Sequence, residues 1–136
     1  MIEYQYYNVK SQINEQQTTD WLEKVVEDEN FVLGEIGYVF CDDEFLLGIN
    51  QEFLQHDTFT DIITFSNSDV DGIISGEIYI SVERVKENSI RLKTNFNQEL
   101  NRVIVHGLLH LLGYKDKKEK DEYLMRQKED YYISMI

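Results

Sequence analysis

The stretch HGLLHLLGYKD, residues 106–116, contains two of the three histidines of the chain, four residues apart in an otherwise apolar segment. The residues before it predict a helix from Asn95 to Leu112, with Asn95 as its N-cap. Because this helix is apolar over much of its circumference, we expect it to run through the middle of the fold. Gly113 is then the left-handed residue that ends the helix and turns the chain back.

His106 and His110 lie one helical turn apart, so their side chains begin about 5–6 Å from each other and can bind one ion. The turn at Gly113 would bring Asp116 to the same ion, and Gly107 would leave room for the ion or a substrate. Two histidines and one carboxylate leave a fourth position for water, which is the pattern of catalytic zinc. A metal-bound water would then be the nucleophile. The alternative is a pair of hydrogen-bonded core histidines without a metal.

The rest of the chain predicts an α+β fold with about four strands in one mixed sheet packed with helices, and with the metal site on the central helix. We expect strands over residues 1–9, 34–41, 60–66 and 74–81. We expect one helix that begins at about Thr19 and a short helix that Asp42 caps. Three further helices are expected over residues 81–88, 95–112 and 118–133. No repeat, linker or domain boundary appears, so residues 1–136 are expected to form a single domain.

The charge of the chain is unevenly distributed, although its formal net value is -13. Residues 1–83 contain two basic and 18 acidic residues, whereas residues 84–136 contain 11 basic and eight acidic ones. The basic half also carries the histidine pair. This bias favours either a solvated helical surface or a local positive field beside a site that binds an anion.

The N-terminus lacks the basic and apolar regions of a signal peptide, and no apolar run reaches the roughly 18 residues of a membrane helix. The single cysteine, Cys41, cannot form an internal disulfide, which fits a reducing compartment. These features predict a cytoplasmic protein without a membrane partner.

Three segments in this order, INQEFLQHDTFTDIITFS (residues 49–66), SGEIYIS (75–81) and HGLLHLLGYKD, resemble the YbeY family of bacterial rRNA-maturation endoribonucleases. The resemblance covers nearly the whole chain. It implies a zinc-dependent, single-strand-directed endoribonuclease that acts in 16S rRNA processing and ribosome quality control. It also implies one zinc per chain, and ribosomal RNA and the small ribosomal subunit as partners, with an assembly GTPase as a further candidate. We expect the protein to be a monomer.

The chain departs from the family pattern at three positions. The family usually has a third histidine where this chain has Asp116, which can still bind zinc but makes the bound water less acidic. It usually has arginine and lysine at Leu54 and His56, where they are thought to hold RNA phosphate. Basic residues of the second half are expected to replace them: Arg84, Lys86, Arg91, Lys93, Lys115, Lys117 and Lys118.

The sequence leaves the roles of several further residues open. His56 is either a phosphate contact or general acid near the metal, or a loop histidine bonded to Asp57 or Thr60. Asp61 is expected to be a turn residue at the start of a strand rather than a catalytic group. Glu77 is either the partner of a site histidine or an exposed strand residue.

Two other functions compete with the nuclease. In HExxH zinc peptidases a glutamate follows the first histidine as general base, and here that position is Gly107. A metallopeptidase-like hydrolase is therefore disfavoured but not excluded by the histidine spacing. The other alternative is a non-catalytic ribosome-assembly factor in which the metal is structural.

Overall fold

The computed structural model describes residues 1–54 and 60–136. Its elements in chain order are β1 (Ile2–Tyr6), α1 (Glu15–Asp28), β2 (Val32–Cys41), α2 (Asp43–Leu54), β3 (Ile62–Ser66), β4 (Ile73–Ser81), α3 (Val82–Leu92), α4 (Phe96–Leu111) and α5 (Glu119–Ile133). The predicted α+β class is confirmed. None of the helices in the described residues combines the length and apolarity of a membrane-spanning segment.

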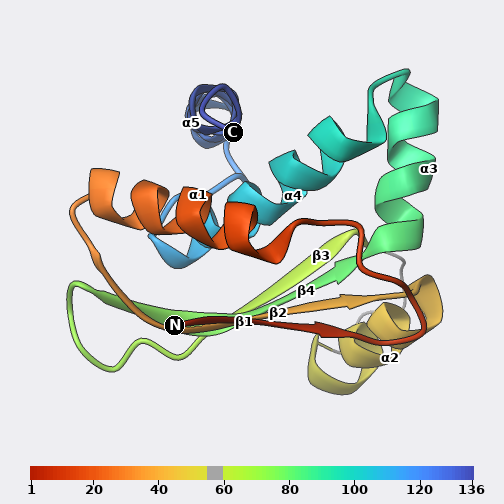
Figure 1. Ribbon diagram of the computed structural model, residues 1–136, viewed down its shortest axis with the longest axis horizontal. Coiled ribbons are helices and arrows are strands. Elements are labelled where there is room, and N and C mark those ends of the chain that lie inside the picture. Colours follow the sequence, from red (N-terminus) through yellow and green to blue (C-terminus); the bar gives the residue numbers. More distant parts are fainter. Residues whose placement is uncertain (55–59) are drawn as a thin grey trace.

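The described strands form one mixed sheet in the order β1-β2-β4-β3. Strands β1 and β4 pair with β2 in parallel, whereas β3 pairs with β4 antiparallel. Helices α1 and α4 cover one face of this sheet, α5 lies above α4, and α2 lies on the opposite face near one end (Figure 1). The predicted four-stranded mixed sheet is thereby confirmed.

Helix α1 begins earlier than the sequence predicted. The expected start was about Thr19, but the helix begins at Glu15 because the Asn14 side chain accepts a hydrogen bond of 3.0 Å from the Gln17 backbone N–H. This is an N-cap contact that satisfies one of the free N–H groups of the first turn. The first turn of α1 is polar and mostly exposed, so it carried no apolar signal.

Helix α4 lies at the centre of the fold, as predicted. Leu100, Ile104 and Leu108 are at most 1% exposed, and they belong to one core with residues of α1, β2 and β4. The Tyr38 hydroxyl of β2 donates a hydrogen bond of 2.7 Å to the Ile104 carbonyl. Packing on this scale fixes the position of the helix, and with it the positions of His106 and His110.

Gly107 does not have the predicted role. A Cβ atom at this position would lie 2.8 Å from Ile78 Cγ2 and 2.9 Å from Ile62 Cδ1, so the glycine faces β3 and β4. It lets the helix backbone approach the sheet closely. The expectation that Gly107 makes room for an ion or a substrate is therefore wrong.

Gly107→Ala is expected to lower the free energy of unfolding by about 1–3 kcal/mol, because the added methyl group overpacks the contact between α4 and the sheet. Urea denaturation of the variant beside the parent protein measures this change. Unchanged stability would mean that the overpacking costs no more than the roughly 1 kcal/mol by which alanine is favoured over glycine in a helix.

Candidate metal centre

The end of α4 turns the chain back as the sequence predicted. Gly113 adopts φ of 107°. Its N–H bonds to the His110 carbonyl, and the Tyr114 N–H bonds to the Leu109 carbonyl, each at 3.0 Å. This pair of hydrogen bonds is the Schellman motif, in which the left-handed residue is usually glycine. The turn directs the following residues back towards the last turn of the helix.

The turn brings Asp116 to the two histidines. Its Oδ2 atom lies 3.1 Å from His110 Nε2 and 3.3 Å from His106 Nε2. One ligand atom from each of the three side chains lies within 4.8 Å of the others. All three side chains are partly exposed, so solvent and a ligand can reach them. The structure thus brings together the three residues that the sequence predicted as metal ligands.

The other ring nitrogen of each histidine faces a hydrogen-bond acceptor. His106 Nδ1 lies 2.6 Å from Glu129 Oε2, and His110 Nδ1 lies 3.0 Å from the Tyr114 carbonyl oxygen. Both acceptors favour a proton on Nδ1, which leaves the lone pair of each neutral ring on Nε2. Two lone pairs and a carboxylate oxygen then meet at one point. This donor set fits a divalent cation better than a core histidine pair.

Sequence reasoning missed Glu129 and Arg102. Glu129 lies on α5 and is 4% exposed. Its Oε1 atom accepts a hydrogen bond of 2.9 Å from Arg102 Nη1 of α4, while Arg102 Nη2 donates to Asp130 at 2.7 Å. A usable signal was present, since Glu129 shares the buried face of α5 with Met125 and Tyr132. A carboxylate on a buried helix face is rare unless it is paired.

Glu77 does not contact either histidine. Its side chain is exposed and accepts a hydrogen bond of 2.9 Å from the Tyr79 hydroxyl. The interpretation of Glu77 as a histidine partner is therefore wrong, and the exposed strand residue is confirmed. Successive strand residues point to opposite faces of a sheet. Glu77 therefore points away from the face on which its buried neighbours Gly76 and Ile78 lie.

Asp61 lies closer to the site than the sequence indicated. Its carbonyl accepts a hydrogen bond from the Ser81 N–H at the start of β3, as expected of a residue that leads into a strand. Its side chain also lines a hollow of about 320 Å³ beside His106 and Asp116. Burial raises the pKa of the Asp61 carboxyl, although the charge of His106 opposes this.

A second hollow, of about 470 Å³, is lined by His110, Lys115, Asp116, Lys117, Lys118 and Asp121. Three predicted RNA contacts, the lysines of the loop between α4 and α5, therefore lie next to the candidate centre. The three lysines place positive charges beside the three donors, and such charges are suited to an anionic ligand.

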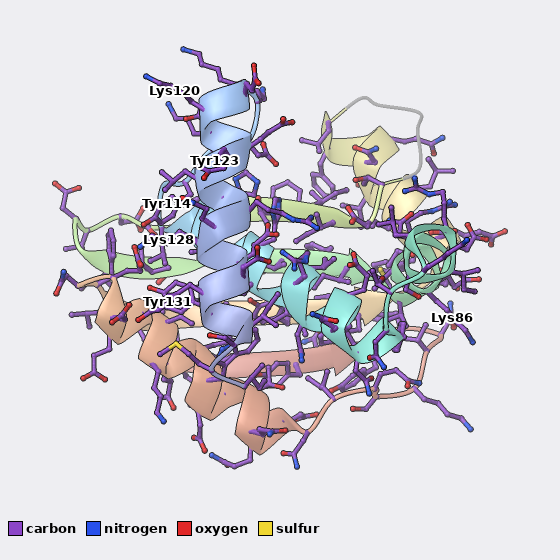
Figure 2. The ribbon with its side chains drawn as sticks, turned by 90° about the horizontal axis from the view of Figure 1, so that it is seen from above. Lys86, Tyr114, Lys120, Tyr123, Lys128 and Tyr131 are labelled. Atoms are coloured by element: carbon purple, nitrogen blue, oxygen red, sulfur yellow. The ribbon has the colours of Figure 1, made fainter. Side chains whose placement is uncertain are left out.

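The other predicted RNA contacts lie on α3 and just after it. Figure 2 shows Lys86 on α3, well apart from Tyr114 and from Lys128 on α5. Arg84 forms ion pairs with Asp43 at 2.9 Å and Glu87 at 2.8 Å. The structure does not bring these residues to the candidate centre. His56 lies outside the described residues, and Leu54 is an exposed residue at the end of α2.

The surroundings of His106 raise its pKa. Burial acts to lower the pKa, but the hydrogen bond with Glu129 and the negative charges of Glu129, Asp116 and Asp61 outweigh it. A divalent ion must displace the proton that these charges attract. Metal affinity should therefore fall as the pH is lowered.

The metal-free protein should show the opposite dependence. Because the pKa of His106 is raised on folding, its protonation stabilises the metal-free fold. This contribution is fully present below about pH 6.5, the ordinary pKa of histidine, and is lost as the pH rises through the raised value. Urea denaturation of chelator-treated parent and His106→Gln protein over this range measures the difference. Parallel pH profiles for the two proteins would contradict the prediction.

Fold and site together define an α+β protein whose central helix and returning loop present a three-donor cluster suited to one divalent ion. The chain matches the family model described as Endoribonuclease YbeY over residues 3–136. It therefore belongs to the YbeY family.

Individual relatives agree with this assignment. The chain is 51% identical over 136 residues to Endoribonuclease YbeY of Flavobacterium johnsoniae, in an alignment that covers 100% of this chain and 97% of the relative. It is 50% identical over 122 residues to Endoribonuclease YbeY of Christiangramia forsetii, in an alignment that covers 90% of this chain and 85% of the relative. The solution structure of TM1509 from Thermotoga maritima is similar with a TM-score of 0.69 and 28% identity, covering 98% of this chain and 87% of that one.

Proposed function

We propose that this protein is a metal-dependent endoribonuclease that cleaves single-stranded RNA during rRNA maturation and ribosome quality control. The observation that carries the proposal is the convergence of His106 Nε2, His110 Nε2 and Asp116 Oδ2 on one accessible point. Membership of a family named for endoribonucleases supports the choice of substrate. The whole of residues 1–136 would act as a single domain and as a monomer in the cytoplasm.

The proposed ion is zinc, one per chain. Two imidazole nitrogens and one carboxylate oxygen are typical zinc donors, although other first-row divalent metals accept the same set. A zinc ion held there would polarise a phosphoryl oxygen of the RNA. The group that attacks the phosphorus would be either a water activated by the ion or the ribose 2′-hydroxyl. Asp116 makes the centre more negative than a third histidine would, which strengthens the attraction for the cation.

The proposed role of Lys115, Lys117 and Lys118 is to hold the RNA backbone beside the centre. The hollow that they line also reaches His110 and Asp116. Lysine side chains bind phosphate oxygens as point charges and carry no sequence information. The partners proposed for the protein are ribosomal RNA and the small ribosomal subunit, with an assembly GTPase as a further candidate.

Cleavage assays on single-stranded RNA test the proposed activity. The purified protein is treated with a chelator and then supplied with zinc, manganese or magnesium separately. We expect loss of cleavage after chelation, recovery with zinc, and slower cleavage of a duplex of the same sequence. Intact RNA under all conditions would favour the assembly factor without catalysis.

A casein digest tests the peptidase alternative with the same preparations. The position of the peptidase glutamate is Gly107, which faces β3 and β4 and not the candidate centre. We therefore expect no metal-dependent proteolysis. Proteolysis that returns with zinc would displace the RNA function.

A further inference from the structure

We propose that Glu129 is a positioning residue for the metal centre: it fixes the ring orientation and the protonated nitrogen of His106, and Arg102 fixes Glu129. The inference rests on the metal centre of the proposed function. It concerns a different element of the fold, because Glu129 lies on α5 whereas both histidines lie on α4.

The two oxygens of the Glu129 carboxylate have separate partners. Oε2 lies 2.6 Å from His106 Nδ1, and Oε1 lies 2.9 Å from Arg102 Nη1. The Glu129 side chain is 6% exposed and that of Arg102 is 13% exposed. Arg102 therefore supplies the positive charge that a buried carboxylate needs, and it leaves the other oxygen to the histidine.

Helix α5 is itself held firmly against the rest of the fold. The Trp21 indole N–H donates a hydrogen bond of 2.8 Å to the Tyr132 carbonyl. The Tyr132 hydroxyl donates to the carboxylates of Asp28 and Glu29 at the C-terminal end of α1. Lys128 binds Glu29 at 3.0 Å and lies over the Tyr114 ring, near which Figure 2 shows it. These contacts lie within one turn of Glu129, so its carboxylate has a defined position relative to α4.

The two histidines are supported differently. His110 Nδ1 faces a backbone carbonyl of its own C-terminal turn, which no side-chain substitution removes. His106 Nδ1 faces a carboxylate from another helix. A carboxylate partner increases the basicity of a ligand imidazole and orients the ring, and loss of such a partner commonly weakens metal binding by about 10- to 100-fold.

Glu129→Gln and Asp130→Asn form a matched pair of variants. Each neutralises one of the two adjacent carboxylates that bind Arg102, but only Glu129 contacts His106. Zinc affinity is measured by competition with a chromophoric chelator. We expect Glu129→Gln to bind zinc about 10- to 100-fold more weakly than the parent. Asp130→Asn, which alters an exposed ion pair, should stay within about fivefold.

A long-range ¹H–¹⁵N correlation spectrum of the zinc-loaded proteins provides a second measurement. In the parent, the His106 Nδ1–H proton should be shifted downfield by its carboxylate partner and protected from exchange. In Glu129→Gln this signal should move upfield or disappear, while the His110 Nδ1–H signal stays in place as an internal control. A loss of packing alone would not affect the two signals so differently.

The outcomes separate the inference from the proposed function. Zinc affinity and a His106 signal unchanged in Glu129→Gln would overturn the positioning role, as would an equal loss in Asp130→Asn. A parent protein that binds no zinc would instead remove the metal centre itself. If Glu129→Gln unfolds because Arg102 loses the buried one of its two carboxylate partners, the double variant Glu129→Gln/Arg102→Gln removes both charges and is put through the same two measurements.

Discussion

His110→Ala is expected to reduce metal-dependent RNA cleavage by about a thousandfold or more. The substitution removes one of three donors, and a metal ion contributes several kcal/mol to the stabilisation of a phosphoryl-transfer transition state. Each 1.4 kcal/mol, approximately, corresponds to a factor of ten in rate. Initial cleavage rates on a labelled single-stranded RNA measure the loss. Zinc is supplied at a concentration above the dissociation constant of the parent protein for zinc.

The control for this experiment is Asn97→Ala, an exposed substitution on the same helix. It should cleave at the parental rate. His110 is partly exposed, so the variant is expected to fold, and a circular dichroism spectrum verifies this. Cleavage by His110→Ala at the parental rate would assign the activity to a contaminating nuclease.

Neutralising Lys115, Lys117 and Lys118 together to glutamine should weaken RNA binding strongly and make it less dependent on salt. For single strands, each phosphate contact contributes about 0.7 to the slope of log affinity against log salt concentration. Loss of three contacts would therefore lower the slope by about 2. Fluorescence anisotropy with a labelled RNA and the non-cleaving His110→Ala background, titrated at several salt concentrations, measures both quantities.

A matched triple substitution of Lys86, Arg91 and Lys93 to glutamine removes the same formal charge from α3 and the residue after it. Because these side chains lie apart from the candidate centre, this variant should lose much less affinity. Equal losses in the two variants would mean that the overall charge of the second half, rather than the loop between α4 and α5, governs binding. An unchanged slope in the loop variant would exclude the lysines as phosphate contacts.

The parts of the site that could be predicted from sequence depend on local signals. The spacing of His106 and His110, the glycine that ends α4, and the short return to Asp116 all lie within 11 consecutive residues. Helix geometry and a single left-handed turn suffice to place three side chains over such a distance. For the same reason, the elements with clear alternation or capping residues were predicted within a few residues of their observed bounds.

The parts that could not be predicted depend on contacts between distant elements. Glu129 meets His106 across 23 residues of sequence, and this contact exists only because α5 packs on α4. Similarly, the role of Gly107 depends on which face of α4 lies against β3 and β4. Helical periodicity left this face open because the helix is apolar over much of its circumference. Asp61 lies near the centre because β3, which it precedes, packs against α4, and its own segment indicated only the start of a strand.

The metal content of the purified protein, measured for the parent beside Asp116→Ala, tests the central claim most directly. Both proteins are prepared without chelator and analysed by elemental mass spectrometry, so that the identity of the ion is found as well as its amount. Three converging donors predict about one zinc per chain in the parent and a large loss in the variant. An absence of metal in both proteins, or an equal content in both, would contradict a centre formed by His106, His110 and Asp116.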